Sequence, residues 1–258
     1  MVMNMLIDTH CHFEDDQYEN SDEFIELAFK HQLKRIIISG YDIKSSELAV
    51  MLAHKYNEVY ATVGFHPHCC NEIDDSSYNK FDTWLCDDKV VGVGEIGLDY
   101  FYDGDQKDQQ IKMFKKQIEI AEKYQKPVVV HNRNASHDIY NILKDSNVKG
   151  IIHCFSDDAN MATKFIEMGF LLGIGGIITF KNNRLKEVIK SIPLKYIVLE
   201  TDSPYLTPEP FRGRQNHPKN LTFVASAIAK IKDIEYNEVA SITSLNAERL
   251  FDFNRDLC

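Results

Sequence analysis

The segment Leu6-Ile-Asp-Thr-His-Cys-His12 places two histidines at the end of a short apolar run. A continuous run of β-branched and apolar residues is typical of a strand that is covered on both faces, and we predict a strand over Met5–His10. The same unit, an apolar run that ends in side chains able to bind metal, recurs along the chain. The number of copies and the segments between them determine the predicted fold.

Eight such strands are predicted, with longer amphipathic segments between them. The predicted strands are Met5–His10, Arg35–Gly40, Val59–Phe65, Val90–Gly97, Pro127–His131, Lys149–Phe155, Phe170–Gly176 and Tyr196–Asp202. The predicted helices, from their apolar spacing of three and four residues, are Ser21–Gln32, Ser45–Tyr56, Ser77–Cys86, Asp105–Tyr124, Ser136–Asp145, Ala159–Met168, Asn183–Ser191, Asn220–Lys232 and Tyr236–Phe251.

This alternation, without a Pro/Gly-rich linker, predicts one α/β domain over residues 1–258, folded as a single (β/α)8 TIM barrel. A doubly wound open sheet has the same alternation and is the structural alternative. The residues at the strand ends favour the barrel. The carboxyl ends of barrel strands converge on one mouth, whereas those of an open sheet spread along a line.

The charge balance is acidic, because 29 Lys and Arg residues stand against 39 Asp and Glu residues, giving a net charge of -10. This excludes a protein that binds nucleic acid through a broad basic surface. A phosphate-containing substrate would need a local cationic site, such as one built from bound metal. With 44% hydrophobic and 26% charged residues, the composition also excludes a mainly disordered chain.

The apolar runs all fall far short of the roughly 20 residues that span a bilayer. The segment Met1-Val-Met-Asn-Met-Leu-Ile-Asp8 lacks the basic and long apolar regions of a signal peptide. No Cys-x-x-Cys pair occurs, so the cysteines are expected to be reduced thiols and the protein to be cytoplasmic. These cysteines are Cys11, Cys69, Cys70, Cys86, Cys154 and Cys258.

Metal-binding side chains follow most of the predicted strands. The candidate ligands are His10, His12, Glu95, His131, His153 and Asp202. Four imidazoles and two carboxylates suit one or two divalent ions of the Zn, Mn, Co or Ni kind. A carboxylate such as Glu95 can bridge two ions, and a water shared between the ions loses a proton easily. Asp202 could bind an ion and also take that proton as a general base.

Each of these residues also has a simpler interpretation. His131 or His153 could be a hydrogen-bonded core histidine, and Glu95 could be a salt-bridge partner in the barrel floor. Asp202 could cap a helix or a turn. Together, these interpretations require several unrelated polar groups to be buried at apolar strand ends, each costly if unsatisfied. A shared metal centre accounts for all of them at once.

The chain resembles the TatD family of metal-dependent deoxyribonucleases in a series of motifs. These are Asp8-Thr-His-Cys-His12, Gly64-Phe-His-Pro-His68, Gly94-Glu-Ile-Gly-Leu-Asp-Tyr100, His131-Asn-Arg133, His153-Cys-Phe-Ser156, Glu200-Thr-Asp-Ser-Pro-Tyr-Leu206, Arg212-Gly-Arg-Gln-Asn-His-Pro218 and Asn246-Ala-Glu-Arg-Leu-Phe251. They occur in order from about Leu6 to Phe251 and so cover nearly the whole chain.

The resemblance implies a barrel of the amidohydrolase type with one or two divalent ions, whether Zn, Mn, Mg, Co or Ni. It implies that His10, His12 and Asp202 hold one ion, that His131 and His153 hold the second, and that Glu95 lies between them. The implied activity is metal-dependent hydrolysis of DNA, often from the 3′ end, with single strands or 3′ ends as substrate. The alternatives are an amidohydrolase-type enzyme that cleaves C–N or carboxylic-ester bonds, and a catalytically inactive metal-binding scaffold.

Several further residues are candidates for contact with the substrate. The resemblance suggests that His66 faces the substrate as a catalytic residue, although a turn stiffened by Pro67 would explain it equally well. Arg133 follows His131 by two positions, so it is expected to project into the mouth and bind phosphate, or else to pair with a carboxylate. Arg212 and Arg214 could add a local cationic contact or lie in a solvated loop.

Aromatic residues and departures from the family pattern also bear on the substrate. Tyr100 and Phe101 could stack on an unpaired base or belong to the core. The family commonly has His-Ser-Arg-Asp-Ala where this chain has Asn132 and Asn134, and glycine where it has Asp157. None of the three is a predicted ligand, so these departures concern substrate preference rather than metal binding.

Overall fold

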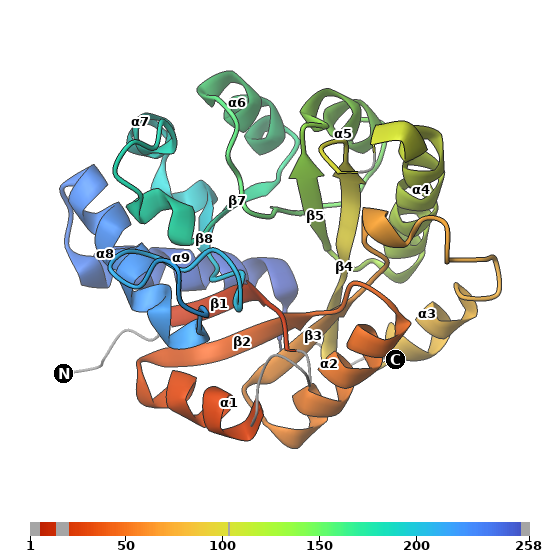
Figure 1. The fold of residues 1–258 in the computed structure, drawn as a ribbon, viewed down its shortest axis with the longest axis horizontal. Coiled ribbons are helices and arrows are strands. Elements are labelled where there is room, and N and C mark those ends of the chain that lie inside the picture. Colours follow the sequence, from red (N-terminus) through yellow and green to blue (C-terminus); the bar gives the residue numbers. More distant parts are fainter. Residues whose placement is uncertain (1–5, 14–20, 103, 254–258) are drawn as a thin grey trace.

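Eight parallel strands form one sheet, and their order in the sheet follows the chain from β1 to β8. A computed structural model describes residues 6–13, 21–102 and 104–253. The strands are β1 (Leu6–Cys11), β2 (Leu33–Ser39), β3 (Val59–Val63), β4 (Val90–Asp99), β5 (Val128–Arg133), β6 (Gly150–Ile152), β7 (Leu171–Ile174) and β8 (Ile197–Leu199). They form a nearly closed barrel with helices outside it (Figure 1), which confirms the predicted fold and excludes the doubly wound sheet.

The helices lie where the sequence predicts them. They are α1 (Ser21–Lys30), α2 (Ile43–Lys55), α3 (Asn79–Trp84), α4 (Lys107–Tyr124), α5 (Ser136–Leu143), α6 (Ala159–Glu167), α7 (Leu185–Ser191), α8 (Leu221–Lys232) and α9 (Tyr236–Phe251). Within the described ranges, no helix is long and apolar enough to cross a membrane. No disulfide joins the described cysteines, which are Cys11, Cys69, Cys70, Cys86 and Cys154, in agreement with the prediction of reduced thiols. Met5 and Cys258 lie outside the described residues.

The strand ends differ from the prediction. Strands β6 and β8 stop at Ile152 and Leu199, so the predicted extensions to Phe155 and Asp202 are wrong. Cys154 and Asp202 have left-handed backbone conformations, with φ of 47° and 54°, which are incompatible with continued strand pairing. In contrast, β4 and β5 run past the predicted ends because Asp99 still pairs with Arg133.

The barrel interior consists of an apolar layer below a polar one. The apolar layer contains Ile7, Ile37, Tyr60, Val91, Val129, Ile151 and Val198, and Ala247 and Phe251 of α9 pack against it. Alternate residues of a strand share a face. Two positions after five of these apolar residues, on the strand or just past its end, stand Ser39, Thr62, His131, His153 and Glu200. Because side chains on one face of a strand repeat every two residues, a layer of polar side chains lies directly above the apolar layer. This polar layer is at the carboxyl end of the strands, where the active sites of such barrels lie.

Hydrogen bonds from β1 to the end of β8 and to the segment after it close the barrel. Thr9 Oγ1 donates to the Leu199 carbonyl at 3.0 Å, and the Asp202 amide donates to the His10 carbonyl at 3.0 Å. Buried Asp8 accepts from the Thr201 amide and hydroxyl at 2.9 and 2.6 Å. Burial raises the pKa of Asp8 to about 8, although these hydrogen bonds act in the opposite direction. The same segments carry His10 and Asp202, so closing the barrel also brings predicted ligands together.

The loop between β8 and α8 is fastened to the barrel by two side chains. Asn216 Nδ2 donates to the carbonyls of Thr201 and Tyr205, at 2.9 and 2.7 Å. His217 is buried, its ring stacks on Phe24 of α1 with centroids 4.5 Å apart, and no partner for its Nε2 occurs among the described residues. Burial, with Lys219 nearby, lowers the pKa of His217 to about 3.

We predict that His217 makes the protein less stable in acid. An unfolded histidine binds a proton below its ordinary pKa of 6.5, whereas folded His217 stays neutral to about pH 3. The free energy of unfolding should therefore fall as the pH drops from about 6.5 towards 3. In His217→Asn that contribution is absent, so urea unfolding at pH 7.5, 6, 5 and 4 should show the wild-type curve approaching or crossing that of the variant.

Asparagine at position 217 can still cap the short turn that follows. The matched control is His137→Asn, because His137 is exposed on α5. A wild-type-minus-variant difference for His217→Asn that stays constant over this pH range would contradict the prediction.

Candidate metal centre

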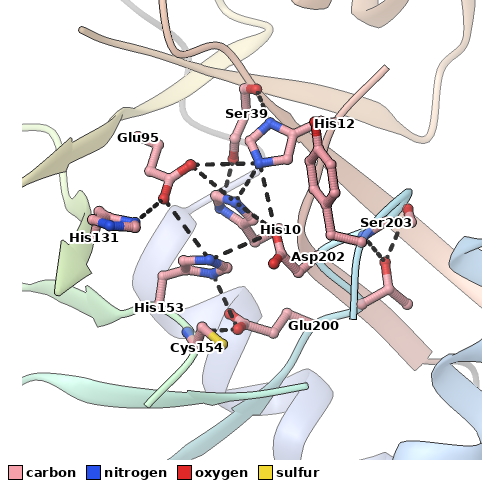
Figure 2. A network of polar contacts seen from close by, with 12 residues as sticks. His10, His12, Ser39, Glu95, His131, His153, Cys154, Glu200, Asp202 and Ser203 are labelled. Atoms are coloured by element: carbon pink, nitrogen blue, oxygen red, sulfur yellow. Dashed lines mark hydrogen bonds and ion pairs between the residues drawn. The ribbon is translucent and has the colours of Figure 1, made fainter. Parts of the chain in front are cut away.

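The predicted ligands converge at the mouth of the barrel (Figure 2). His10 and His12 come from β1 and its end, Glu95 from β4, His131 from β5, and His153 and Asp202 from the turns after β6 and β8. His12 Nε2 lies 3.4 Å from Glu95 Oε2 and 3.5 Å from Asp202 Oδ1. His10 Nε2 lies 3.5 and 3.7 Å from the same two atoms.

These separations suit a bound divalent ion. Ligand atoms placed tetrahedrally around an ion at about 2.0–2.2 Å are roughly 3.4 Å apart. The carboxylate–imidazole separations of 3.4 to 3.7 Å are close to that value, and the Nε2 atoms of His10 and His12 are 3.0 Å apart. The donors are two imidazoles and two carboxylates, which suit Zn or a similar ion.

The second oxygen of Glu95 faces a different set of histidines. Glu95 Oε1 lies 2.8 Å from His131 Nδ1 and 3.8 Å from His153 Nε2. His66 Nε2 also lies 3.8 Å from it. Glu95 therefore stands between His10 and His12 on one side and His66 and His131 on the other, an arrangement that could serve two neighbouring ions as well as one. His153 lies nearer the first group, because its ring stacks on His10 and its Nε2 is 3.7 Å from Asp202 Oδ1.

Ser39, at the end of β2, orients both histidines of β1. His12 Nδ1 donates to the Ser39 carbonyl at 2.9 Å, and because a carbonyl only accepts, the lone pair of His12 is on Nε2, which faces the cluster. His10 Nδ1 lies 2.9 Å from Ser39 Oγ, which also accepts from Thr62. Outer contacts of this kind fix the ring and tautomer of a histidine ligand.

Two carboxylates that the sequence analysis did not select orient the other histidines. Asp99 Oδ2 lies within hydrogen-bond distance of His131 Nε2, at 3.1 Å, and Glu200 Oε1 forms an ion-pair contact with His153 Nδ1 at 3.0 Å. Both acids stand within motifs quoted above: Asp99 follows the predicted ligand Glu95 by four positions, and Glu200 precedes Asp202 by two. This proximity to predicted ligands is the signal in the sequence that could have identified the two acids. It does not distinguish an acid that orients a histidine from an acid that binds the metal.

The carboxylate of Glu200 occupies space that is open because residue 173 is a glycine. It is fully buried, its Oε1 accepts from the Cys154 amide at 2.6 Å, and its Oε2 has no hydrogen-bond partner among the described residues. A Cβ added to Gly173 of β7 would lie 2.2 Å from that Oε2. The absence of a side chain at Gly173 therefore allows the carboxylate to stand beside His153.

The electrostatics of the cluster favour positive charge. Burial opposes protonation of His153, but the carboxylates of Glu200 and Asp202 outweigh it and raise its pKa to about 9. Burial likewise opposes ionisation of Glu95, yet His10, with other histidines around it, holds the pKa of Glu95 well below its usual range. A field that keeps Glu95 ionised and raises the pKa of His153 also favours a divalent cation.

The remaining candidates lie around this cluster. Buried His66 accepts a hydrogen bond from the His68 amide on Nδ1 at 3.3 Å, and His68 itself is half exposed, with Nε2 3.5 Å from Asp99. Arg133 is exposed, and its guanidinium stacks over Phe101 and Tyr102 at 4.2 and 4.5 Å from the ring centres. Among the described residues, no carboxylate forms an ion pair with Arg133.

The other two arginines lie in the loop after β8. The Arg212 guanidinium stacks over the ring of Phe180 at 4.3 Å, whereas Arg214 is exposed and its carbonyl accepts from Thr207. Among the described residues, neither Arg212 nor Arg214 contacts a candidate metal ligand. Tyr100 is half-buried and donates to Asp138, so of the two predicted aromatic residues Phe101 is the exposed one.

We predict that Glu200 and Gly173 strengthen metal binding. Removing the partner that orients a histidine ligand typically weakens metal affinity about 10- to 100-fold. Glu200→Ala removes that partner of His153, and Gly173→Ala displaces it. Calorimetric titration with Zn²⁺ and Mn²⁺ should show weaker binding by both variants. Glu209→Ala, in the same loop region, is the control; affinities equal to the wild type in both Glu200→Ala and Gly173→Ala would contradict the prediction.

Comparison with known proteins identifies the family. The model of the TatD related DNase family matches residues 7–252. An uncharacterized metal-dependent hydrolase of Bacillus subtilis, YabD, is 40% identical over 97% of this chain and 100% of its own length. The uncharacterized metal-dependent hydrolase YcfH of Escherichia coli is 33% identical over 95% of each chain.

A solved structure agrees with the sequence matches. The crystal structure of YJJV, a TatD homologue from Escherichia coli, superposes with a TM-score of 0.91, at 29% identity, over 98% of this chain and 99% of that one. The family prediction is thus confirmed: the chain belongs to the TatD related DNase family of metal-dependent hydrolases.

Proposed function

We propose that this protein hydrolyses phosphodiester bonds of DNA, with single strands or 3′ ends as substrate. The observation that carries the proposal is the cluster at the barrel mouth, in which both oxygens of Glu95 face imidazoles. In this proposal His10, His12 and Asp202 hold one ion, and His131 and His153 hold a second, with Glu95 between them. A bound divalent ion supplies a Lewis acid and a water of lowered pKa.

Two side chains have the chemistry to move or hold protons beside the reacting bond. Asp202 Oδ1 faces the histidines, and burial, which would raise its pKa, is outweighed by His153 and its neighbours, so its pKa is lowered. It is therefore ionised at neutral pH and can accept the proton of the attacking water.

His66 is the second such side chain. Burial, together with His131, lowers the pKa of His66 well below its ordinary value, so this ring is neutral. Its Nδ1 accepts from the His68 amide, which places the ring proton on Nε2. His66 can then donate a hydrogen bond from Nε2 to an oxygen of the phosphodiester.

The arginines support a phosphate-containing substrate on a protein with a net charge of -10. A guanidinium that stacks its face on an aromatic ring, as in Arg133 and Arg212, still presents N–H groups at its edge. That edge matches two oxygens of a phosphate. Arg214 is a third candidate contact. Such contacts are few, which agrees with recognition at the mouth rather than along a basic surface.

Loss of the central carboxylate should abolish activity. We expect Glu95→Ala to fold, to bind less metal, and to leave 5′-labelled single-stranded DNA uncleaved, because Glu95 contacts both groups of histidines. Excess chelator should have the same effect on the wild type. The measurements are DNA cleavage with each divalent metal, metal content and melting temperature, with Glu119→Ala on the exposed face of α4 as control.

The same assay should include duplex DNA, RNA and a panel of amides and esters. Cleavage of amides or carboxylic esters without cleavage of DNA would favour the amidohydrolase alternative. Full DNA cleavage by Glu95→Ala, or in excess chelator, would refute the proposed mechanism.

Replacing Arg133 by lysine should slow DNA cleavage while metal content stays unchanged. A charge-assisted hydrogen bond is worth about 1.5–3 kcal/mol, or about one to two decades in rate, and an ammonium cannot replace the planar guanidinium. The rate, melting temperature and metal content of Arg133→Lys would be compared with those of Arg249→Lys, an exposed site on α9. A lowered melting temperature with an intact rate would instead assign Arg133 a structural role.

A further inference from the structure

Two exposed aromatic rings stand beside the cluster of candidate metal ligands. The side chains of Phe101 and Tyr102 are 57% and 62% exposed, more than any other aromatic side chain among the described residues. Their rings meet edge to face, with centroids 4.8 Å apart. The guanidinium of Arg133 lies over both rings. We call these three residues the aromatic platform.

A buried carboxylate, that of Asp99, connects this platform to the cluster. Asp99 Oδ2 lies 3.1 Å from Nε2 of the candidate ligand His131. Asp99 Oδ1 accepts from the amides of Phe101 and Tyr102 at 2.9 and 3.1 Å. The loop is therefore held in place by the same side chain that orients the histidine, so the position of the platform relative to the cluster is fixed.

The backbone around Asp99 is also held on both sides. Gln110 of α4 accepts from the Asp99 amide at 2.9 Å and donates to its carbonyl at 3.0 Å. Asp99 pairs with Arg133 across β4 and β5, and the Tyr100 amide donates to the Arg133 carbonyl at 2.9 Å. Both halves of the platform thus belong to one hydrogen-bonded unit, and neither ring is pulled into the core.

Exposed rings in this position match a planar aromatic ligand. Bases of single-stranded nucleic acid stack on aromatic side chains and on arginine, and this stacking is tolerant of sequence because every base has a π face. The edge of the Arg133 guanidinium remains available to a phosphate. Base and phosphate of one nucleotide could then be held by adjacent parts of the same platform.

We propose that the aromatic platform is the subsite for an unpaired base next to the bond that is cleaved. The inference rests on the proposed function and extends it, because it identifies how a single strand would be held. A base paired within a duplex is stacked between its neighbours and has no free face for Phe101 or Tyr102. The platform therefore selects single-stranded or frayed ends over intact duplex.

The test combines removal of the base with removal of the rings. The substrates are 5′-labelled single strands, either unmodified or with one abasic residue at the terminal, second or third position from the 3′ end. The enzymes are the wild type and Phe101→Leu/Tyr102→Leu, each with bound divalent metal. Stacking on one base is worth enough to change kcat/KM roughly 10- to 100-fold.

The expected result is non-additivity at one abasic position. The wild type should lose about tenfold or more in kcat/KM when that base is missing. The double variant should show a comparable loss on the unmodified strand and little further loss on the abasic one. Phe101→Trp should retain the activity and the base dependence. Metal content should be unchanged in all variants, and Met51→Ala, an exposed apolar site on α2, is the control.

Two results would overturn the proposal in different ways. If the wild type cleaves the unmodified strand and abasic residues have no effect, or if the two losses simply multiply, the platform is not a base subsite while the proposed function stands. If the wild type leaves the unmodified strand intact with every divalent metal, the proposed function itself fails, and the role of the platform fails with it.

Discussion

The contact between the first strand and the segment after the last one is the constraint on which the rest depends. The Asp202 amide binds the His10 carbonyl, and the His12 amide binds the Ser203 carbonyl at 2.7 Å. These hydrogen bonds do not follow the regular pattern of paired strands, so the backbone can turn here. The turn brings the side chains of His10, His12 and Asp202 close together. Because these ligands lie on both sides of the seam, the cluster exists only when the barrel is closed.

Much of the free-energy cost of burying so many polar groups is offset by contacts within the cluster. An unsatisfied buried polar atom is expensive, and the polar layer offsets this by sharing partners. Ser39 serves His10 and His12 together, and Glu95 faces histidines with both of its oxygens. The apolar layer beneath excludes water from below, with Phe251 packed against it. The polar layer can then be specialised for binding a cation, because the hydrophobic floor and the outer helices stabilise the fold.

Hydrogen bonds of Asp99 and Asn216 position the loops around the cluster. Asp99 joins His131 to the loop that bears Phe101 and Tyr102. On the other side of the mouth, Asn216 ties the loop bearing Arg212 and Arg214 to the backbone of Thr201, next to Asp202. Both loops are thus fastened to residues that contact or adjoin candidate ligands, His131 in one case and Asp202 in the other.

The sequence by itself determined the alternation of strands and helices and the set of candidate ligands. Both are local patterns, since strand periodicity and a polar residue at a strand end can be counted along the chain. The tertiary structure alone decided which strand ends curl away, as at Cys154 and Asp202, and which acids orient histidines, as Asp99 and Glu200 do. It also decided that Arg133 stacks on Phe101 and Tyr102. Such roles depend on neighbours from other strands, and a serine such as Ser39 or a glycine such as Gly173 acquires its role only when the barrel brings a histidine or a carboxylate against it.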